Sequence, residues 1–224
     1  ERWLEIIDQI QGAAAQTRLK IPVLYGLDTI HGANYVMGST LFPQQLGLAA
    51  TGNPALIADL YEIATHDTLR AGVPWLFSPV GDVGRKPSWP RLWEGFGEDV
   101  YQCTVLTKAA TEGIERVGGA ASCLKHFIGY GYTLSGKDRT PAWIPERQLR
   151  EYFLPPFVEA IKAGAQTIMI NSGEVNGIPV HANKALLTDM VRGELGFDGV
   201  LVTDWEDVIF LHTLHKIADS YHTA

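Results

Sequence analysis

The sequence contains little cysteine and no long apolar segment. Its 224 residues include two cysteines, Cys103 and Cys123. No hydrophobic run approaches the roughly 20 residues of a membrane-spanning helix. Two distant cysteines form neither a disulfide framework nor a metal-binding cluster, so we interpret both as buried free thiols. We therefore expect no metal, no cofactor and no membrane partner.

Basic runs and phosphate-binding loops are absent as well. The chain has 18 Lys and Arg against 25 Asp and Glu, a net charge of −7, which argues against a nucleic-acid partner. Gly129-Tyr130-Gly131 has no third glycine and no helix start after it, so it does not match a phosphate-binding loop. We therefore do not expect nucleotide binding.

Apolar runs and helical patterns alternate along the chain. Strand-like runs occur at residues 21–27, 75–80, 120–127, 166–171 and 199–203. Helical patterns lie at residues 54–70, 98–116, 145–162, 184–195 and 209–221. This alternation predicts a parallel sheet, in either a doubly wound fold or a (β/α)8 TIM-type barrel. The long aromatic loops after the strands favour the barrel, whose active site is formed by such loops.

Both ends of the sequence lie within or close to helical patterns. Residue 1 is a glutamate that opens such a pattern, and the last pattern ends three residues before the chain does. We therefore expect residues 1–224 to be a fragment, an incomplete barrel domain of a longer protein that lacks the last barrel strands.

Polar side chains follow the apolar runs where parallel strands would end. The fifth run stops at Asp204, with Trp205 beside it. Strand C-terminal ends face the active site in such barrels, so Asp204 is a candidate catalytic carboxylate, with a helix N-cap as the alternative. Asp28 follows the first run, and Lys125 and His126 end the third. These three suit a ligand rich in hydroxyls, and a turn aspartate, a salt bridge and a buried histidine are the structural alternatives.

The loop at residues 81–99 combines aromatic side chains with arginines and acids, among them Trp89, Arg91, Trp93 and Glu94. Aromatic faces pack against the C–H faces of sugar rings, and Arg and Glu bind hydroxyls. The alternative is a surface loop held together by Arg–Glu pairs. Because exposed tryptophans are costly on a surface without a ligand, we interpret the loop as part of a sugar site.

Five ordered motifs together resemble glycoside hydrolase family 3, in its β-glucosidase and exo-β-glucanase branch. They are GLDTIHG, RKPSWPRLWEGFGED, KHF, NGIPVHAN and GVLVTDW. The resemblance extends from about residue 20 to 211 and implies a (β/α)8 or collapsed barrel followed by an α/β sandwich domain. It implies that Asp204 is the catalytic nucleophile and that Trp205 flanks the first sugar subsite. It also implies substrate-binding roles for Asp28, Arg91, Glu94, Lys125 and His126.

The implied reaction is hydrolysis of terminal non-reducing β-D-glucosyl residues, from glucosides or β-glucans, by a retaining mechanism. In this branch the acid/base glutamate comes from the second domain, so the missing C-terminal domain of the same protein is an expected partner. The loop at 129–141 lacks the histidine of one-domain N-acetylglucosaminidases, which argues against hexosaminidase activity. The family tendency implies a periplasmic or secreted location.

Two other functions stay open at the level of the sequence. A Schiff-base aldolase would use Lys125 at a strand end of the same kind of barrel. A non-catalytic remnant would bind sugar without turning it over. General acid/base catalysis typically raises the reaction rate by about 10²–10⁴-fold. Because the fragment lacks that group, we expect weak or no hydrolysis of unactivated glucosides by residues 1–224 alone.

Overall fold

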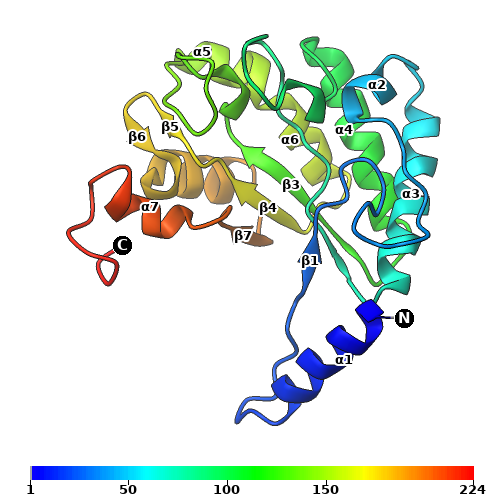
Figure 1. Cartoon of the computed structure of the whole chain (residues 1–224). Helices are drawn as coiled ribbons and strands as arrows, with labels where there is room; N and C mark the ends of the chain where they lie inside the picture. The colour runs from blue at the N-terminus through cyan, green and yellow to red at the C-terminus, as the bar shows by residue number, and fades with distance from the viewer. Residues whose placement is uncertain (1) are drawn as a thin grey trace.

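A parallel sheet forms the centre of the computed structural model, which describes residues 2–224 (Figure 1). Its five strands run in the order β1-β2-β3-β4-β7, and all neighbours are parallel. They are β1 (Gly26–Leu27), β2 (Trp75–Leu76), β3 (Ala121–Phe127), β4 (Thr167–Ile170) and β7 (Val200–Val202). A separate antiparallel hairpin joins β5 (Glu174–Val175) to β6 (Ile178–Pro179). The parallel α/β arrangement predicted from the alternation is confirmed.

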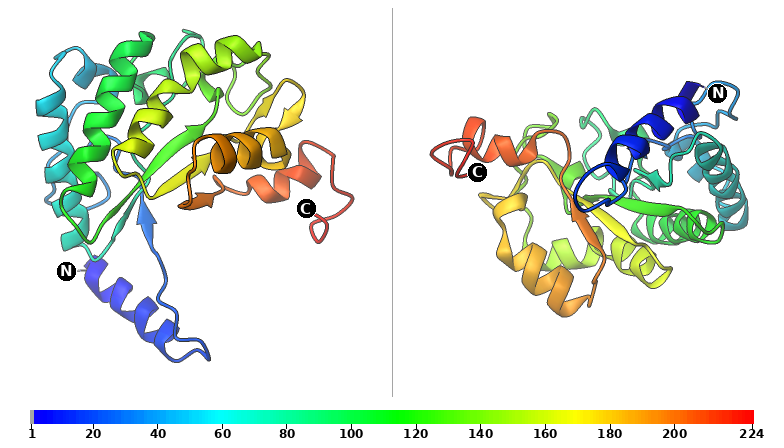
Figure 2. Two further views of the ribbon diagram at one scale, coloured as in Figure 1. Left: turned by 180° about the vertical axis from the view of Figure 1, so that it is seen from behind. Right: turned by 90° about the horizontal axis from the view of Figure 1, so that it is seen from below.

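One face of the sheet is covered by a layer of helices, seen in front of the sheet in the view from behind (Figure 2). The layer consists of α3 (Pro54–Arg70), α4 (Val100–Glu115) and α6 (Pro155–Lys162), with the π-helical segment η5 (Ala185–Glu194) near β4 and β7. The main hydrophobic core lies between this layer and the sheet. It includes Leu106, Leu124, Phe157 and Ile168.

Local sequence signals set the starts and the close packing of these helices. The Asn53 side chain accepts a hydrogen bond from the Leu56 amide and Pro54 follows it, which confirms the predicted start of α3. Asp99 caps α4 in the same way. The two helices approach closely at Gly113, where a Cβ atom would lie 2.2 Å from the Ala58 carbonyl oxygen. Any larger residue at Gly113 would push α4 away from α3.

The first predicted strand is longer in the sequence pattern than in the structure. Only Gly26–Leu27 pair, and the apolar side chains of Ile21, Val23 and Leu24 are exposed. A continuous apolar run of this kind is typical of a buried strand, but pairing requires a neighbouring strand, and none lies beside residues 21–25 within residues 2–224. The second run also shortens to Trp75–Leu76, because Pro79 has no backbone N–H to donate, and Val80 makes one isolated bridge.

The last predicted helix, at residues 209–221, is wrong in its extent. Helix α7 covers Asp207–Thr213, and the chain then turns, with Lys216 in the left-handed region at φ 57°. The predicted helix at 145–162 consists of three segments, the last of which begins at Pro155. They are α5 (Glu146–Gln148), η3 (Leu149–Phe153) and α6.

Shorter elements and one long helix complete the fold. They are α1 (Arg2–Ala15), α2 (Gln45–Ala49), η1 (Leu92–Glu94), η2 (Tyr130–Tyr132) and η4 (Val180–Ala182). Helix α1 projects away from the body of the molecule (Figure 1). Cys103 and Cys123 are buried free thiols, as predicted. From residue 2 to residue 224, no helix has the length and apolarity needed to cross a membrane.

Candidate active site

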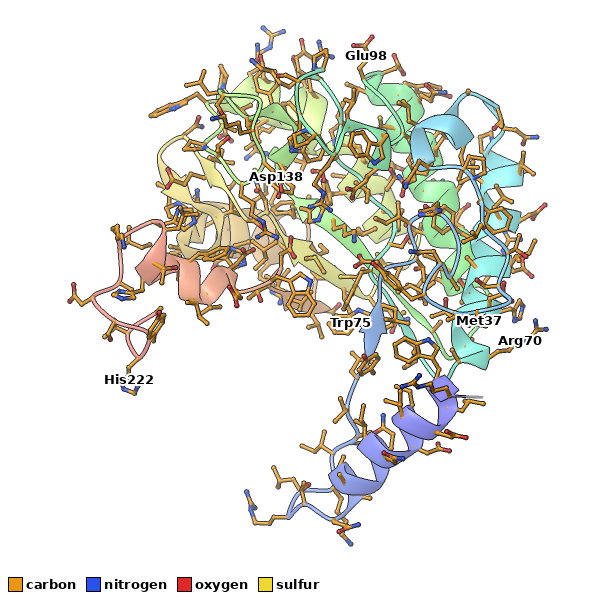
Figure 3. All side chains as sticks on the ribbon, viewed as in Figure 1. Met37, Arg70, Trp75, Glu98, Asp138 and His222 are labelled. Atoms are coloured by element: carbon orange, nitrogen blue, oxygen red, sulfur yellow. The ribbon has the colours of Figure 1, made fainter. Side chains whose placement is uncertain are left out.

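An open cavity of about 760 Å³ lies on the sheet face opposite the helix layer. Alternate residues of a strand point to opposite faces, so the strands supply both the cavity and the core. Lys125 and Met169 line the cavity, whereas their neighbours Leu124 and Ile168 belong to the core under the helices. Trp75 lines the cavity too, and lies beside β1 (Figure 3).

Six of the seven candidate residues line this one cavity, although they come from four separate regions of the chain. They are Asp28, Arg91, Lys125, His126, Asp204 and Trp205. Glu94 does not line it, but its carboxylate forms a two-pronged bond with the Arg91 guanidinium at 2.8 and 2.7 Å. Its place is therefore behind Arg91, where it fixes the direction of that side chain.

Lys125 and Asp28 form an ion pair across the sheet, from the end of β3 to the loop after β1. The lysine is 2% exposed, whereas the Asp28 side chain is 39% exposed. One carboxylate oxygen of Asp28 accepts the bond, and its partial exposure leaves it accessible from the cavity. The pair thus offers a ligand an acceptor and a fixed positive charge side by side.

His126 is held between Arg91 and Asp82. Arg91 Nη2 lies 3.2 Å from His126 Nε2, and His126 Nδ1 lies 2.8 Å from Asp82 Oδ2. A guanidinium can only donate, so Nε2 accepts and we assign the ring proton to Nδ1, which donates to Asp82. Burial, together with the charges of Arg91, Lys125 and Arg139, lowers the pKa of His126 well below its usual value. The ring is therefore neutral and supports Arg91.

Asp82 is a buried carboxylate that the sequence analysis did not single out. Its Oδ2 also accepts the His126 backbone N–H at 3.0 Å. Burial raises the pKa of Asp82 to about 7, partly offset by that backbone hydrogen bond. Its position in Gly81-Asp82, directly after the second apolar run, is the sequence feature that could have indicated it as a site residue.

The Asp204 carboxylate is fixed by three donors. Its Oδ1 accepts the Trp205 backbone N–H at 2.6 Å, and its Oδ2 accepts the Ser172 hydroxyl at 3.1 Å and Arg139 Nη2 at 3.3 Å. His126 Nε2 lies 3.9 Å from Oδ2. The cation in contact with Asp204 is Arg139.

Arg139 and Ser172 are further residues that the sequence analysis missed. Arg139 follows Asp138, which lies near the C-terminal tip of β3 in Figure 3. Ser172 lies directly after β4, and Arg139 lies in the long loop after β3, beside Lys137 and Asp138. Charged residues in a loop after a barrel strand are the sequence feature that could have indicated Arg139.

The aromatic residues divide between the cavity and the core. Trp205 is 78% exposed and lines the cavity, as expected for a platform beside a sugar ring. Trp89 is 1% exposed and packs edge-on against Tyr130, so the prediction that it stacks on a sugar is wrong. Trp93 is half exposed but does not line the cavity. Trp89 therefore packs inside the protein, and Trp93 lies outside this cavity.

Comparison with known proteins agrees with this geometry. Residues 1–224 match the glycosyl hydrolase family 3 N terminal domain over their whole length. The chain belongs to glycosyl hydrolase family 3. Its sheet is therefore part of the TIM-type barrel of that family, as the resemblance implied. Among residues 2–224, no group of three or more His, Cys, Asp or Glu is arranged to hold a metal ion.

Two curated relatives show how the chain compares with longer proteins. A "Lysosomal beta glucosidase" of Dictyostelium discoideum is 48% identical over 99% of this chain and 28% of its own length. A "Periplasmic beta-glucosidase" of Salmonella typhimurium is 30% identical over 85% of this chain and 25% of its own length. The chain thus spans between a quarter and a third of the length of these relatives.

Solved structures resemble the whole described fold. A β-glucosidase from Erythrobacter marinus superimposes with a TM-score of 0.92 at 32% identity, covering 98% of this chain and 30% of that chain. A β-glucosidase from Listeria innocua in complex with glucose gives a TM-score of 0.89 at 33% identity, covering 96% of this chain and 30% of that chain.

Proposed function

We propose that this chain carries the nucleophile and the glucosyl-binding residues of a retaining β-glucosidase or exo-β-glucanase. The observation that carries the proposal is the position of Asp204. Its carboxylate lies at the end of β7 on the wall of a cavity that Asp28, Arg91 and Lys125 also line. The glucosidases named among the relatives, and the glucose-bound structure, support glucose as the unit bound.

In the proposed mechanism, Asp204 attacks the anomeric carbon, the glycosidic bond breaks and the aglycone leaves with a proton from the acid/base group. The covalent glycosyl-enzyme is then hydrolysed by water, which releases glucose and frees Asp204. Asp28 accepts hydrogen bonds from sugar hydroxyl groups, while Lys125 and Arg91 donate hydrogen bonds to hydroxyl oxygens. The binding energy thereby orients the ring for attack. Trp205 packs against the face of the sugar beside the scissile bond. The shared cavity and the hydrogen-bonding groups of these side chains support these roles.

The acid/base carboxylic acid, in this proposal, lies outside residues 1–224. Family membership and the 28% coverage of the Dictyostelium relative support a further domain that contributes it. A β-glucosidase variant from Listeria innocua has been solved with laminaribiose, which supports oligosaccharides among the substrates. The relative from Salmonella typhimurium, which is named periplasmic, supports a periplasmic or secreted location.

The geometry favours a glycosidase over a Schiff-base aldolase. An imine-forming lysine needs a free amine. Here the Lys125 nitrogen is bound to the Asp28 carboxylate, so attack on a carbonyl would first have to break an ion pair.

A mechanism-based inactivator tests the proposal directly. We would incubate the protein with 2,4-dinitrophenyl 2-deoxy-2-fluoro-β-glucoside and identify the labelled peptide by mass spectrometry. The activated leaving group needs no proton, so labelling does not depend on the acid/base group. We expect one adduct, on Asp204. A folded protein that gives no adduct, or an adduct on another residue, would contradict the assignment.

A further inference from the structure

A second carboxylate, Asp207, lies buried behind Asp204. It is the first residue of α7, is 1% exposed, and does not line the cavity. Burying a carboxylate away from water is costly unless partners compensate it. Asp207 lies three residues after Asp204 and does not line the cavity. Its role must therefore come from the groups that it contacts.

Arg139 connects Asp207 to the nucleophile. Its Nη1 donates to Asp207 Oδ1 and to Ser172 Oγ, both at 2.9 Å, while its Nη2 donates to Asp204 Oδ2 at 3.3 Å. One planar guanidinium thus bridges two carboxylates, with the shorter bond to Asp207. Because the group is rigid, fixing one edge against Asp207 also fixes the edge that faces Asp204.

The other groups near Asp207 are two histidines, and neither makes a hydrogen bond to it. His181 from η4 places Nε2 3.6 Å from Asp207 Oδ2, and burial lowers the pKa of His181 to about 4, so this ring is neutral near pH 7. His215, after α7, bonds to Glu174 at 2.7 Å. Burial raises the pKa of Asp207 to about 6, with the nearby Asp204 charge contributing. Above that pH, Asp207 is ionised and Arg139 is the cation in contact with it.

We propose that Asp207 is a positioning residue for the nucleophile and that it acts through Arg139. Asp207 holds the guanidinium so that it makes a single bond to Oδ2 of Asp204. Without Asp207, the guanidinium is free to turn and form the two parallel bonds that arginine prefers with a carboxylate. Oδ1 of Asp204, which already accepts the Trp205 backbone N–H, would then gain a charged donor as well, and its attack on the anomeric carbon would be slowed. This inference rests on the proposed function, in which Asp204 is the nucleophile.

The test compares inactivation kinetics in the full-length protein. We would measure the first-order rate ki, the half-saturation constant Ki and the labelled fraction, using the same fluoroglucoside. The first variant is Asp207→Asn, which keeps the shape of the side chain. The second is Arg139→Lys, which keeps the positive charge but loses the planar guanidinium that reaches both carboxylates. Asp59→Asn is the matched control, because Asp59 pairs with Arg116 on the outer surface, away from the cavity.

We expect ki to fall about 10- to 100-fold in both variants, the range for a misplaced reacting group. Ki should stay within about threefold of wild type, because the sugar-binding side chains are untouched. Asp59→Asn should match wild type in all three quantities. A purely structural role for Asp207 would instead lower the labelled fraction and leave ki of the remaining molecules unchanged.

The outcomes separate this inference from the proposed function. If wild type is labelled at Asp204 but ki is unchanged in Asp207→Asn, only the positioning role is overturned. If Asp207→Asn fails to fold, Arg139→Lys decides in its place, and an unchanged ki there overturns the role. If the wild-type protein is not labelled at Asp204, the proposed function is overturned, and the positioning role with it.

Discussion

The two sides of the cavity differ in how their charges are paired. On the binding wall, which we define as Asp28, Arg91, Lys125 and His126, each cation has one carboxylate of its own. Lys125 pairs with Asp28, Arg91 pairs with Glu94, and the histidine is neutral. Counted together with Glu94, this wall is close to neutral overall. Such pairing suits the recognition of uncharged hydroxyl groups, which need donors and acceptors rather than net charge.

On the nucleophile wall, defined as Arg139, Ser172, Asp204 and Asp207, one guanidinium serves two carboxylates. Above about pH 6 this wall has an excess negative charge. The transition state of glycoside hydrolysis is oxocarbenium-like and develops positive charge at the anomeric centre. Net charge is therefore present only at the nucleophile wall, where the reaction develops charge. The following variants test that division of roles.

Asp204→Asn should have the largest effect, because it removes the attacking oxygen while keeping the shape of the side chain. We expect kcat/KM for an aryl β-glucoside to fall by about 10⁴-fold, the scale seen when a residue of a catalytic unit is removed. The Kd for glucose, measured by calorimetry in the full-length protein, should stay within about threefold. A parallel loss of affinity would show that the two walls do not act separately.

Lys125→Met should have a smaller effect of a different kind. It removes a charged donor from the binding wall, and such hydrogen bonds are worth about 1.5–3 kcal/mol, or roughly 10- to 100-fold in affinity. We expect glucose binding to weaken by that factor, with the labelling site on Asp204 unchanged. Lys162→Met is the control, because its pair with Glu159 is exposed on α6. Equal affinity for glucose in Lys125→Met and wild type would refute the binding role.

Most residues of the binding wall could be predicted from the sequence, but only some residues of the nucleophile wall could be. Asp28, Lys125, His126 and Asp204 directly follow or end apolar runs, so the rule for strand ends in parallel barrels brings them together. Arg139 lies twelve residues beyond Phe127, in a loop whose path no periodicity specifies. Its role depends on tertiary contacts with β7 and α7, which local pattern does not contain.

The fold shows the same limit. The alternation of runs predicted the parallel sheet and its helix layer, because burial on two faces leaves a continuous apolar pattern. The pattern overestimated the strand at 21–27, since an apolar run reports which residues prefer burial and not whether a neighbouring strand is present. Trp89 was assigned to sugar binding from composition alone, whereas its ring fills the core beside Tyr130.

The smallest expected effect concerns stability in acid and comes from Asp207 of the nucleophile wall and the neighbouring His181. Burial lowers the pKa of His181 to about 4, and its side chain is 6% exposed. An unfolded histidine titrates near 6.5, so the unfolded state takes up the proton first as the pH falls. Stability is therefore lost between about pH 6.5 and about pH 4, and by about pH 5 the loss from this residue is about 2 kcal/mol.

His181→Asn should remove that loss, which urea unfolding at about pH 7.5 and about pH 5 would measure in the full-length protein. Asp207 contributes with the opposite sign, because its folded pKa is raised and the folded state binds the proton first. Asp207→Asn should therefore lose more stability on acidification than wild type, and His181→Asn should lose less. If both variants followed the wild-type dependence on pH, the two groups would be solvated rather than buried. The nucleophile wall would then have no buried charge for Arg139 to balance.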